Sequence, residues 1–330
     1  MSTIQDVAKL AGVSVATVSR VLNNSNLVSQ DTKKLVEEAI KKLDYQPNLL
    51  GRNLRRSETK MILVLLPNIS NPFYSKVVKG IEKVAHNNGY NVMLCNTDSD
   101  AKRERMYLDL LKNHLTDGVI FMAPKIEKAE LAEIGKNYPV VQCCEYKEGT
   151  GVPYVSIDNF SASYMAVKHL IDIGHRRIAF LGCESKFNSA MQRKNGYIKA
   201  LEDHEINFDD SIVLYGDYTF NSGFSVGHKL MALKNRPTAL FAISDFMAIG
   251  VIKAIKEKGL KIPDDFAVMG FDNISFTSMY DPMVSTISQP RYDMGRAAME
   301  LILKQLQGVQ CNYEELLLEH ELIIRESTVK

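Results

Sequence analysis

The sequence lacks the features that mark secreted, membrane-spanning and disulfide-rich proteins. No run of about 18 consecutive apolar residues occurs, so neither a membrane-spanning helix nor a membrane partner is predicted. The N-terminus has neither the basic nor the apolar segment of a secretory signal, and we expect a cytoplasmic protein. The cysteines are odd in number and include no CxxC pair, which argues against a disulfide framework and a zinc site. They are Cys95, Cys143, Cys144, Cys183 and Cys311.

Signatures of common enzyme classes are also absent. The sequence contains no GxSxG element, no P-loop and no HExxH motif. Asp98-Ser99-Asp100 resembles the start of a calcium loop but lacks the glycine and the closing glutamate at the required positions. The seven histidines are dispersed, and His175 is better interpreted as a helix-end residue than as a catalytic base. The sequence therefore predicts a protein that is not an enzyme and that needs no metal and no cofactor.

The charge is unevenly distributed along the chain. Residues 1–60 carry ten basic and six acidic residues, whereas the remaining residues carry 30 basic and 33 acidic ones. Only the first segment is basic, as expected if it alone meets a polyanion. A chain of 330 residues has room for one small basic head and a larger body of two lobes.

The first sixty residues predict three short helices. Thr3 caps the first helix, which ends at Gly12 because glycine accepts the left-handed turn. Ser14 caps a second helix from Val15 to about Leu22. A third helix runs from Ser29 to about Leu43. Two short helices joined by a tight turn, with a third packed behind them, indicate a helix-turn-helix.

A plain three-helix bundle would show the same spacing, but three details favour DNA binding. The exposed start of the second helix, Val15-Ala16-Thr17, has small side chains that allow close approach to base edges. Arg20 lies one turn further on and is long enough to reach guanine in a bidentate manner. Hydroxyl and amide groups stand at helix ends, where phosphate is bound. They belong to Thr3, Ser14, Thr17 and Asn23.

The patterns DVAxxAGVSxxTVSRVLN and VSxxTxxxVxxAIxxLxYxPN resemble the head of the LacI/GalR family of bacterial repressors. The resemblance implies that Val15, Ala16 and Arg20 read the major groove and that Tyr45 and the helix-end hydroxyls hold phosphates. It further implies a helix-turn-helix DNA-binding domain over residues 1–47 and a hinge helix and linker over residues 48–60. The resemblance also implies that, in the hinge, Asn48 contacts DNA and Leu54 wedges into the minor groove. The expected partner is a double-stranded, pseudopalindromic operator bound by a homodimer.

Residues 61–330 alternate short aliphatic runs with helical patterns, which predicts parallel sheets with helices on both faces. The strands are expected at 62–66, 91–95, 118–122, 140–144, 177–181, 239–243 and 266–270. Helices are expected at 75–87, 103–115 and 221–233. The overall expectation is an N-terminal all-α head and a C-terminal α/β body of two doubly wound lobes. As in the family, the body resembles periplasmic sugar-binding proteins, which implies chain crossovers near residues 158, 288 and 320. A free periplasmic binding protein is the rival interpretation, but it requires a signal peptide and no helix-turn-helix.

The resemblance also implies a set of effector-binding residues in the cleft between the lobes. The set combines aromatic faces, one arginine, a hydroxyl and two carboxylates, and comprises Phe73, Tyr74, Phe187, Ser189, Arg193, Tyr218, Asp245 and Asp272. Ordinary core packing is the alternative role for Phe73, and helix capping is the alternative for Asp245. Arginine and aspartate bind vicinal hydroxyls while rings cover C–H faces, so a sugar is the predicted effector. A purine base or nucleoside is the open alternative.

A second mechanism follows from the segment 289–299, which is similar to the catabolite-control branch of the family. Those members use a phosphorylated carrier protein as corepressor. Tyr292 and Asp293 fit that branch, whereas Arg296 and Glu300 depart from it. A carboxylate at Glu300 would repel a phosphoserine, so the carrier protein is the second candidate partner.

Overall fold

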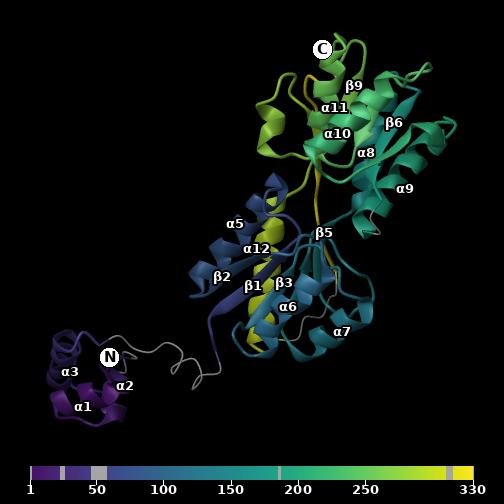
Figure 1. Ribbon diagram of the computed structural model, residues 1–330. Coiled ribbons are helices and arrows are strands. Elements are labelled where there is room, and N and C mark those ends of the chain that lie inside the picture. Colours follow the sequence, from purple (N-terminus) through teal and green to yellow (C-terminus); the bar gives the residue numbers. More distant parts are fainter. Residues whose placement is uncertain (1, 23–26, 46–57, 185–186, 310–314, 330) are drawn as a thin grey trace. The chain divides into compact units, whose positions relative to one another are not determined.

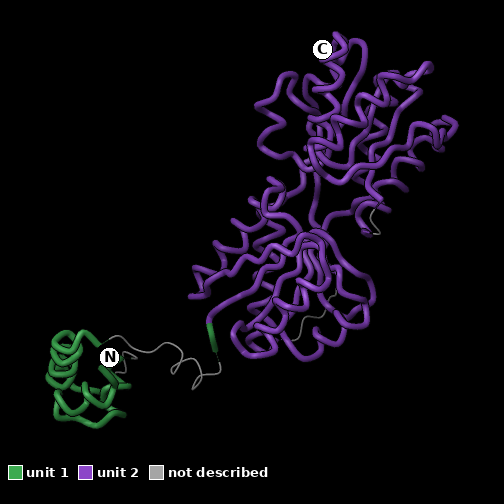
Figure 2. Tube along the Cα trace, viewed as in Figure 1, with its two compact units in different colours: residues 1–59 green, residues 60–330 purple. Residues whose placement is uncertain are grey.

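The computed structural model describes residues 2–22, 27–45, 58–184, 187–309 and 315–329. The chain divides into two compact units, residues 1–59 and 60–330 (Figure 2). Asn23, Asn48, Leu54 and Cys311 lie outside the described residues, as does most of the expected hinge segment. Within the described part of the chain no disulfide forms and no helix is long and apolar enough to cross a membrane. That part also contains no group of histidine, cysteine and acidic residues suited to a metal ion.

The first unit contains three helices, α1 (Ile4–Ala11), α2 (Val15–Leu22) and α3 (Gln30–Lys42). Thr3 and Asp6 form a reciprocal capping box at the start of α1, and Gly12 ends it with a φ of 65°. The Thr17 N–H donates to the Ser14 Oγ at the start of α2. One fully buried valine from each helix fills the small core between them. These helices confirm the predicted helix-turn-helix.

The first sheet of the second unit is entirely parallel and has the strand order β11-β5-β4-β3-β1-β2. Its strands are β1 (Met61–Leu66), β2 (Asn91–Asn96), β3 (Gly118–Phe121), β4 (Val140–Cys143), β5 (Tyr154–Ile157) and β11 (Glu315–Leu318). Two helices, α5 (Pro72–Asn87) and α12 (Arg291–Leu306), pack on one face (Figure 1). Two others, α6 (Ala101–Lys112) and α7 (Lys128–Asn137), cover the opposite face. The continuous burial of β1 follows from this double coverage. We call this sheet and its four helices the first lobe.

The second sheet has the order β12-β10-β9-β8-β6-β7. Its strands are β6 (Ile178–Cys183), β7 (Val213–Gly216), β8 (Ala239–Ala242), β9 (Ala267–Asp272), β10 (Ser285–Ser288) and β12 (Glu321–Ile323). Two helix pairs flank it: α8 (Asn159–Asp172) with α9 (Asn188–Asp203), and α10 (Phe220–Met231) with α11 (Asp245–Glu257). Short 3-10 turns lie at Asp210–Ile212 and Ser275–Ser278. We call this sheet and its helices the second lobe. The edge strand β12 is antiparallel to β10, a departure from the expected all-parallel sheet.

The chain passes between the lobes three times. It leaves the first sheet after β5, returns after β10, and leaves again between β11 and β12. Each lobe is therefore assembled from separate stretches of chain, and α12 belongs to the first lobe although it follows a strand of the second (Figure 1). The predicted two-sheet α/β body is confirmed.

Candidate functional site

The candidate DNA-reading surface is the solvent-facing side of α2. Val15, Ala16 and Arg20 are exposed there, whereas Val18 and Val21 on the opposite side are buried in the head core. The Ser14 and Thr17 hydroxyls lie 2.9 Å apart at the start of the helix. Small side chains at this end leave room for a base edge to approach the helix.

Thr3 and Tyr45 occupy different surroundings in the head. Thr3 is exposed, and its hydroxyl donates to the Asp6 carboxylate at 2.7 Å. Tyr45 is half-buried and packs against the head core. Contacts of Thr3, Ser14, Thr17 and Tyr45 with phosphate remain predictions.

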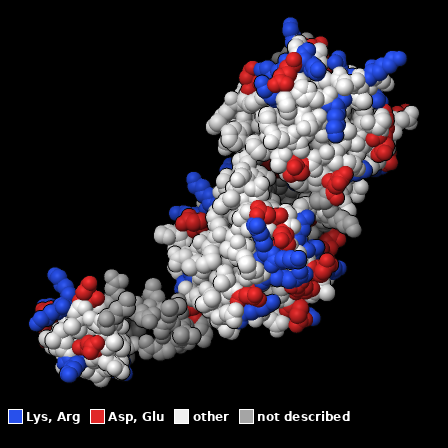
Figure 3. Space-filling model, viewed as in Figure 1, with Lys and Arg blue, Asp and Glu red and all other residues white. Residues whose placement is uncertain are grey.

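The candidate ligand site is a cavity of about 430 Å³ between the two lobes of the second unit (Figure 3). Its walls come from loops after β1, β2, β3 and β4 in the first lobe, and from segments at the ends of β6, β7, β9 and β10 in the second. In parallel sheets ligands bind at the carboxyl ends of strands, and here the ends of two sheets surround one space. A cavity of this size accommodates a mono- or disaccharide or a nucleoside.

Phe73 and Tyr74 lie on the first-lobe wall. The Asn71 side chain caps α5 by accepting a hydrogen bond from the Phe73 N–H at 3.0 Å, and Pro72 starts the helix. Both rings line the cavity, with their centroids 5.2 Å apart in an edge-on arrangement. Phe73 also belongs to the hydrophobic core, which supports the core-packing alternative, and its contact with an effector stays a prediction.

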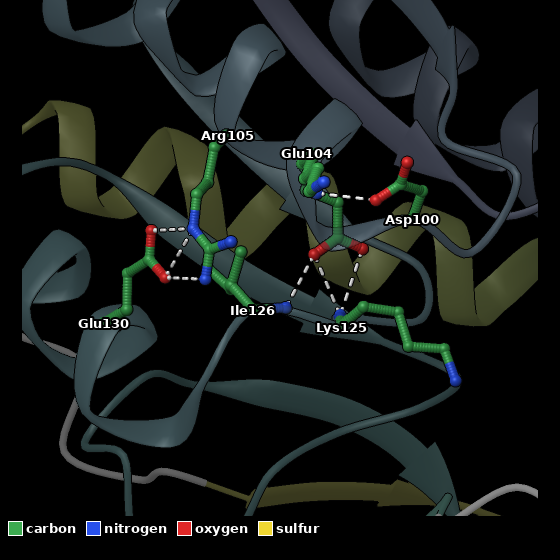
Figure 4. A network of polar contacts seen from close by, with 7 residues as sticks. Asp100, Glu104, Arg105, Lys125, Ile126 and Glu130 are labelled. Carbon is green, nitrogen blue, oxygen red and sulfur yellow. Dashed lines mark hydrogen bonds and ion pairs between the residues drawn. The ribbon is translucent and has the colours of Figure 1, made fainter.

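A buried polar network in the same lobe fixes the loop after β3. The Glu104 carboxylate is almost fully buried and accepts hydrogen bonds from the Lys125 and Ile126 N–H groups, at 2.8 Å in each case (Figure 4). Burial raises the pKa of Glu104, while these N–H groups oppose the rise. Beside it, Arg105 forms a forked ion pair with Glu130. Because the same loop begins with cavity-lining residues, the network holds one wall of the cavity in place.

Arg193 provides the cation of the cavity. It lies on α9, is only 7% exposed, and stacks 3.7 Å above the Phe271 ring. Its Nε donates to Asn159 at 2.9 Å, and its Nη1 donates to the Ile243 carbonyl at 2.7 Å. The guanidinium is therefore held in one orientation at the cavity wall, which suits bidentate binding of a ligand.

Asp272 provides a carboxylate at the end of β9. Gln289, which follows β10, donates from Nε2 to the Asp272 Oδ1 at 2.7 Å, and both residues line the cavity. Burial raises the pKa of Asp272 to about 7; nearby Asp245 adds to the rise, whereas Arg193 and Arg291 oppose it. Sequence reasoning missed Gln289, although its place at the crossover expected near residue 288 was the available signal.

The remaining predicted aromatic and hydroxyl residues come from the second lobe. Tyr218 follows β7 with a φ of 67°, and its hydroxyl lies 3.2 Å from the Cys183 sulfur. Phe187 stands just before α9 with the Lys125 ammonium 3.8 Å from its ring centre, and Ser189 lies in the first turn. All three residues, Phe187, Ser189 and Tyr218, line the cavity.

Asp245 requires a correction, because it does not line the cavity. Its side chain is completely buried in the first turn of α11, and Ser244 occupies the capping position. The carboxylate accepts the Ile274 N–H at 2.9 Å and the Thr286 hydroxyl at 2.6 Å. Asp245 therefore ties the ends of β9 and β10 to α11 and positions Asp272 instead of contacting a ligand. Sequence reasoning could not see this difference, because both aspartates follow buried strands.

Comparison with known proteins assigns both units. Residues 3–48 match the family model described as bacterial regulatory proteins, lacI family, and residues 59–326 match periplasmic binding proteins and sugar binding domain of LacI family. The HTH-type transcriptional repressor CytR of Escherichia coli K12 is 39% identical over 99% of this chain and 96% of its own length.

Two solved structures are similar over most of the chain. The Lac repressor dimer bound to operator and the anti-inducer ONPF has a TM-score of 0.90 at 28% identity, covering 100% of this chain and 99% of the other. A LacI family transcriptional regulator from Enterococcus faecium with bound ribose has a TM-score of 0.74 at 29% identity, covering 81% of this chain and 98% of the other. These relatives are transcriptional regulators and not enzymes.

Proposed function

The chain belongs to the LacI family of DNA-binding transcriptional regulators, and from this premise we propose that it represses sugar-utilisation genes under the control of a neutral sugar. The main support for this proposal is the cavity between the lobes. Arg193, the Asp272–Gln289 pair and several aromatic rings line it together. A forked cation and a carboxylate suit vicinal hydroxyls, and rings suit the apolar face of a sugar. The ribose in the similar Enterococcus faecium regulator supports a pentose.

The same proposal includes a homodimer that presents two heads to a pseudopalindromic operator. One head offers few base contacts, and a twofold axis doubles them. The edge strand β2 supports an interface, because Met93 and Leu94 are 36% and 41% exposed in a sheet whose inner strands are covered. Effector binding then changes the angle between the lobes and with it operator affinity, with a reciprocal coupling of about 1–3 kcal/mol.

A thermal-unfolding screen of sugars, nucleosides and purine bases tests the effector. A ligand present at about 100 times its Kd adds about 2.7 kcal/mol to the free energy of unfolding, which is easily measured. A neutral pentose should raise the melting temperature and change operator affinity. A shift with purine bases alone would replace the sugar by the open alternative.

The phosphorylated carrier protein is the second candidate partner. A surface hollow between α5 and α12 is lined by Lys83, Arg296 and Lys304, which favours an anionic partner. However, Arg296 already pairs with Asp293 at 3.2 Å and with Glu300 at 3.4 Å on its own helix. Stabilisation by a serine-phosphorylated carrier protein, without a response to any sugar, would favour this candidate.

Replacing Arg20 by alanine should weaken operator binding by about 1–3 kcal/mol and relax the preference at one base pair in each half-site. The reason is that a bidentate contact to guanine requires the guanidinium fork. Competition binding with operators altered at single positions measures the change. Arg20→Lys is the control, because it keeps the charge but loses the fork and should still lose the preference. An unchanged base preference in both variants would show that Arg20 contacts only the backbone.

Sugar affinity should depend on pH through Asp272, whose pKa is raised by burial to about 7. Hydroxyl groups donate to the ionised carboxylate, so binding should be about ten-fold weaker near pH 6 than near pH 8. In the absence of ligand the raised pKa has the opposite consequence. It contributes stability that is fully present below the unfolded-state pKa and is lost as the pH rises through about 7.

Calorimetric titration across this pH range measures the sugar affinity. Asp272→Asn is the control, because it should bind weakly at every pH with a flat profile. A wild-type profile as flat as that of the variant would remove Asp272 from the sugar contacts.

A further inference from the structure

Glu145 is a buried carboxylate in the effector cavity that sequence reasoning did not identify. It follows β4 in the first lobe, is 6% exposed and lines the cavity beside Ser189. Its partners lie in the other lobe, at the N-terminus of α9. It accepts the Asn188 N–H at 2.6 Å and the Ser189 N–H at 3.3 Å, and the Ser189 hydroxyl donates to it as well.

This contact gives α9 the cap that its own sequence does not supply. The capping position is Phe187, and no side-chain hydrogen bond from it reaches the helix. The unpaired N–H groups and the dipole at a helix N-terminus attract an anion. The Glu145 carboxylate occupies this place and comes from the opposite wall of the cavity; burial raises its pKa, while the hydrogen bonds from Ser189 and Asn188 oppose the rise. Because Ser189 and Arg193 lie on the same helix, the occupied N-terminus is part of the effector site.

The charged residues around the cavity also disfavour an anionic ligand. Its wall contains four carboxylates and one guanidinium: Asp98, Glu145, Asp217 and Asp272, with Arg193. Asp98 pairs with Arg103 and Asp272 accepts from Gln289, whereas Glu145 accepts from the N–H groups at the N-terminus of α9. Lys125 lines an adjoining hollow and does not line the cavity itself.

We propose that Glu145 is a specificity-determining residue that makes the cavity reject phosphorylated forms of the effector. A phosphate entering the cavity would compete with the Glu145 carboxylate for the N–H groups of Asn188 and Ser189 and would be repelled by it. The regulator therefore responds to the sugar before phosphorylation and not to its phosphomonoester. The proposal rests on the proposed function for the neutral ligand. The role of Glu145 at the N-terminus of α9, however, does not depend on which ligand the cavity binds.

Three full-length variants test the proposal with defined probes. Glu145→Ala vacates the helix N-terminus, and Glu145→Gln keeps the size and a capping oxygen but removes the charge. Glu148→Ala is the matched control, because Glu148 accepts from the Asn188 side chain at 2.9 Å yet does not line the cavity. The probes are inorganic phosphate, D-ribose and ribose 5-phosphate, measured by thermal unfolding and calorimetric titration.

Inorganic phosphate should raise the melting temperature of Glu145→Ala by about 2 °C and leave the wild type and Glu148→Ala unchanged. The wild type should bind ribose 5-phosphate about 100-fold more weakly than ribose, and Glu145→Ala should reduce this ratio by about ten-fold. Glu145→Gln should also reduce the ratio, which decides the question if the alanine variant does not fold.

Equal phosphate responses in the wild type and Glu145→Ala would overturn the proposal, as would a glutamine variant that discriminates like the wild type. Failure of ribose to bind any of the proteins would instead count against the proposed pentose effector. In that case the phosphate response still decides the role of Glu145.

Discussion

Replacing Arg193 by alanine should abolish effector control and leave ligand-free operator binding unchanged. Arg193 is the one cation on the described cavity wall, and its orientation is fixed by Asn159 and the Ile243 carbonyl. Losing a bidentate, charge-assisted contact in a buried site weakens effector binding by about 100-fold or more. Calorimetric titration of the effector and operator binding with and without it measure the two effects separately.

Two further variants make the result specific to the guanidinium. Arg193→Lys keeps the charge but loses the planar fork, so effector affinity should remain strongly reduced. Arg176→Ala removes an arginine that bonds only backbone carbonyls outside the cavity, and it should bind effector normally. Loss of ligand-free operator binding in Arg193→Ala would show that the side chain is structural.

Gly80→Ala should destabilise the first lobe. At an exposed position in a helix the same substitution has the opposite effect and stabilises the helix by up to about 1 kcal/mol. Gly80 on α5 lies directly against α12, and an added Cβ would stand 2.0 Å from the Tyr292 carbonyl oxygen. Gly295 on α12 faces the Val77 carbonyl at the same distance, so the two helices meet backbone to backbone. Neither helix can relax by moving a flexible side chain, and we expect a loss of about 3 kcal/mol or more.

Denaturant unfolding of the variant measures this loss. Lys79→Ala, one residue earlier on the exposed side of α5, is the control and should change stability by less than about 0.5 kcal/mol. A stabilised Gly80→Ala protein would mean that the two helices are not in close contact in solution.

Local sequence patterns predicted those parts of the fold that local chemistry decides. Thr3, Gly12 and Ser29 marked helix ends, and each end lies where its cap was expected. The aliphatic runs predicted strands such as β1 and β8 to within one residue at either end, because strands buried on both faces must be apolar throughout. The helix expected at 103–115 begins two residues earlier, since Asp100 caps it through the Lys102 N–H.

The cavity was predictable only in part, because its residues meet across long distances in sequence. Asp245 and Asp272 each follow a buried strand, and only the packing of α11 against β9 shows which one faces the cavity. Glu145 gives no local signal, because its partners at the start of α9 belong to the other lobe. Gln289 likewise acquires its role only by meeting Asp272 on the neighbouring strand.

The triple passage of the chain between the lobes has a consequence for how such genes recombine. The first lobe combines residues 60–157 with 291–318, and the second combines 159–288 with 321–329. A single exchange point inside the body therefore joins parts of two parental lobes and separates residues, such as Gly80 and Gly295, at which the two helices lie in close contact. The head, in contrast, is one uninterrupted stretch that ends at residue 59. A single recombination point at the end of the head transfers the complete DNA-binding unit. Operator choice is therefore inherited as a module, whereas effector choice is inherited with the entire body.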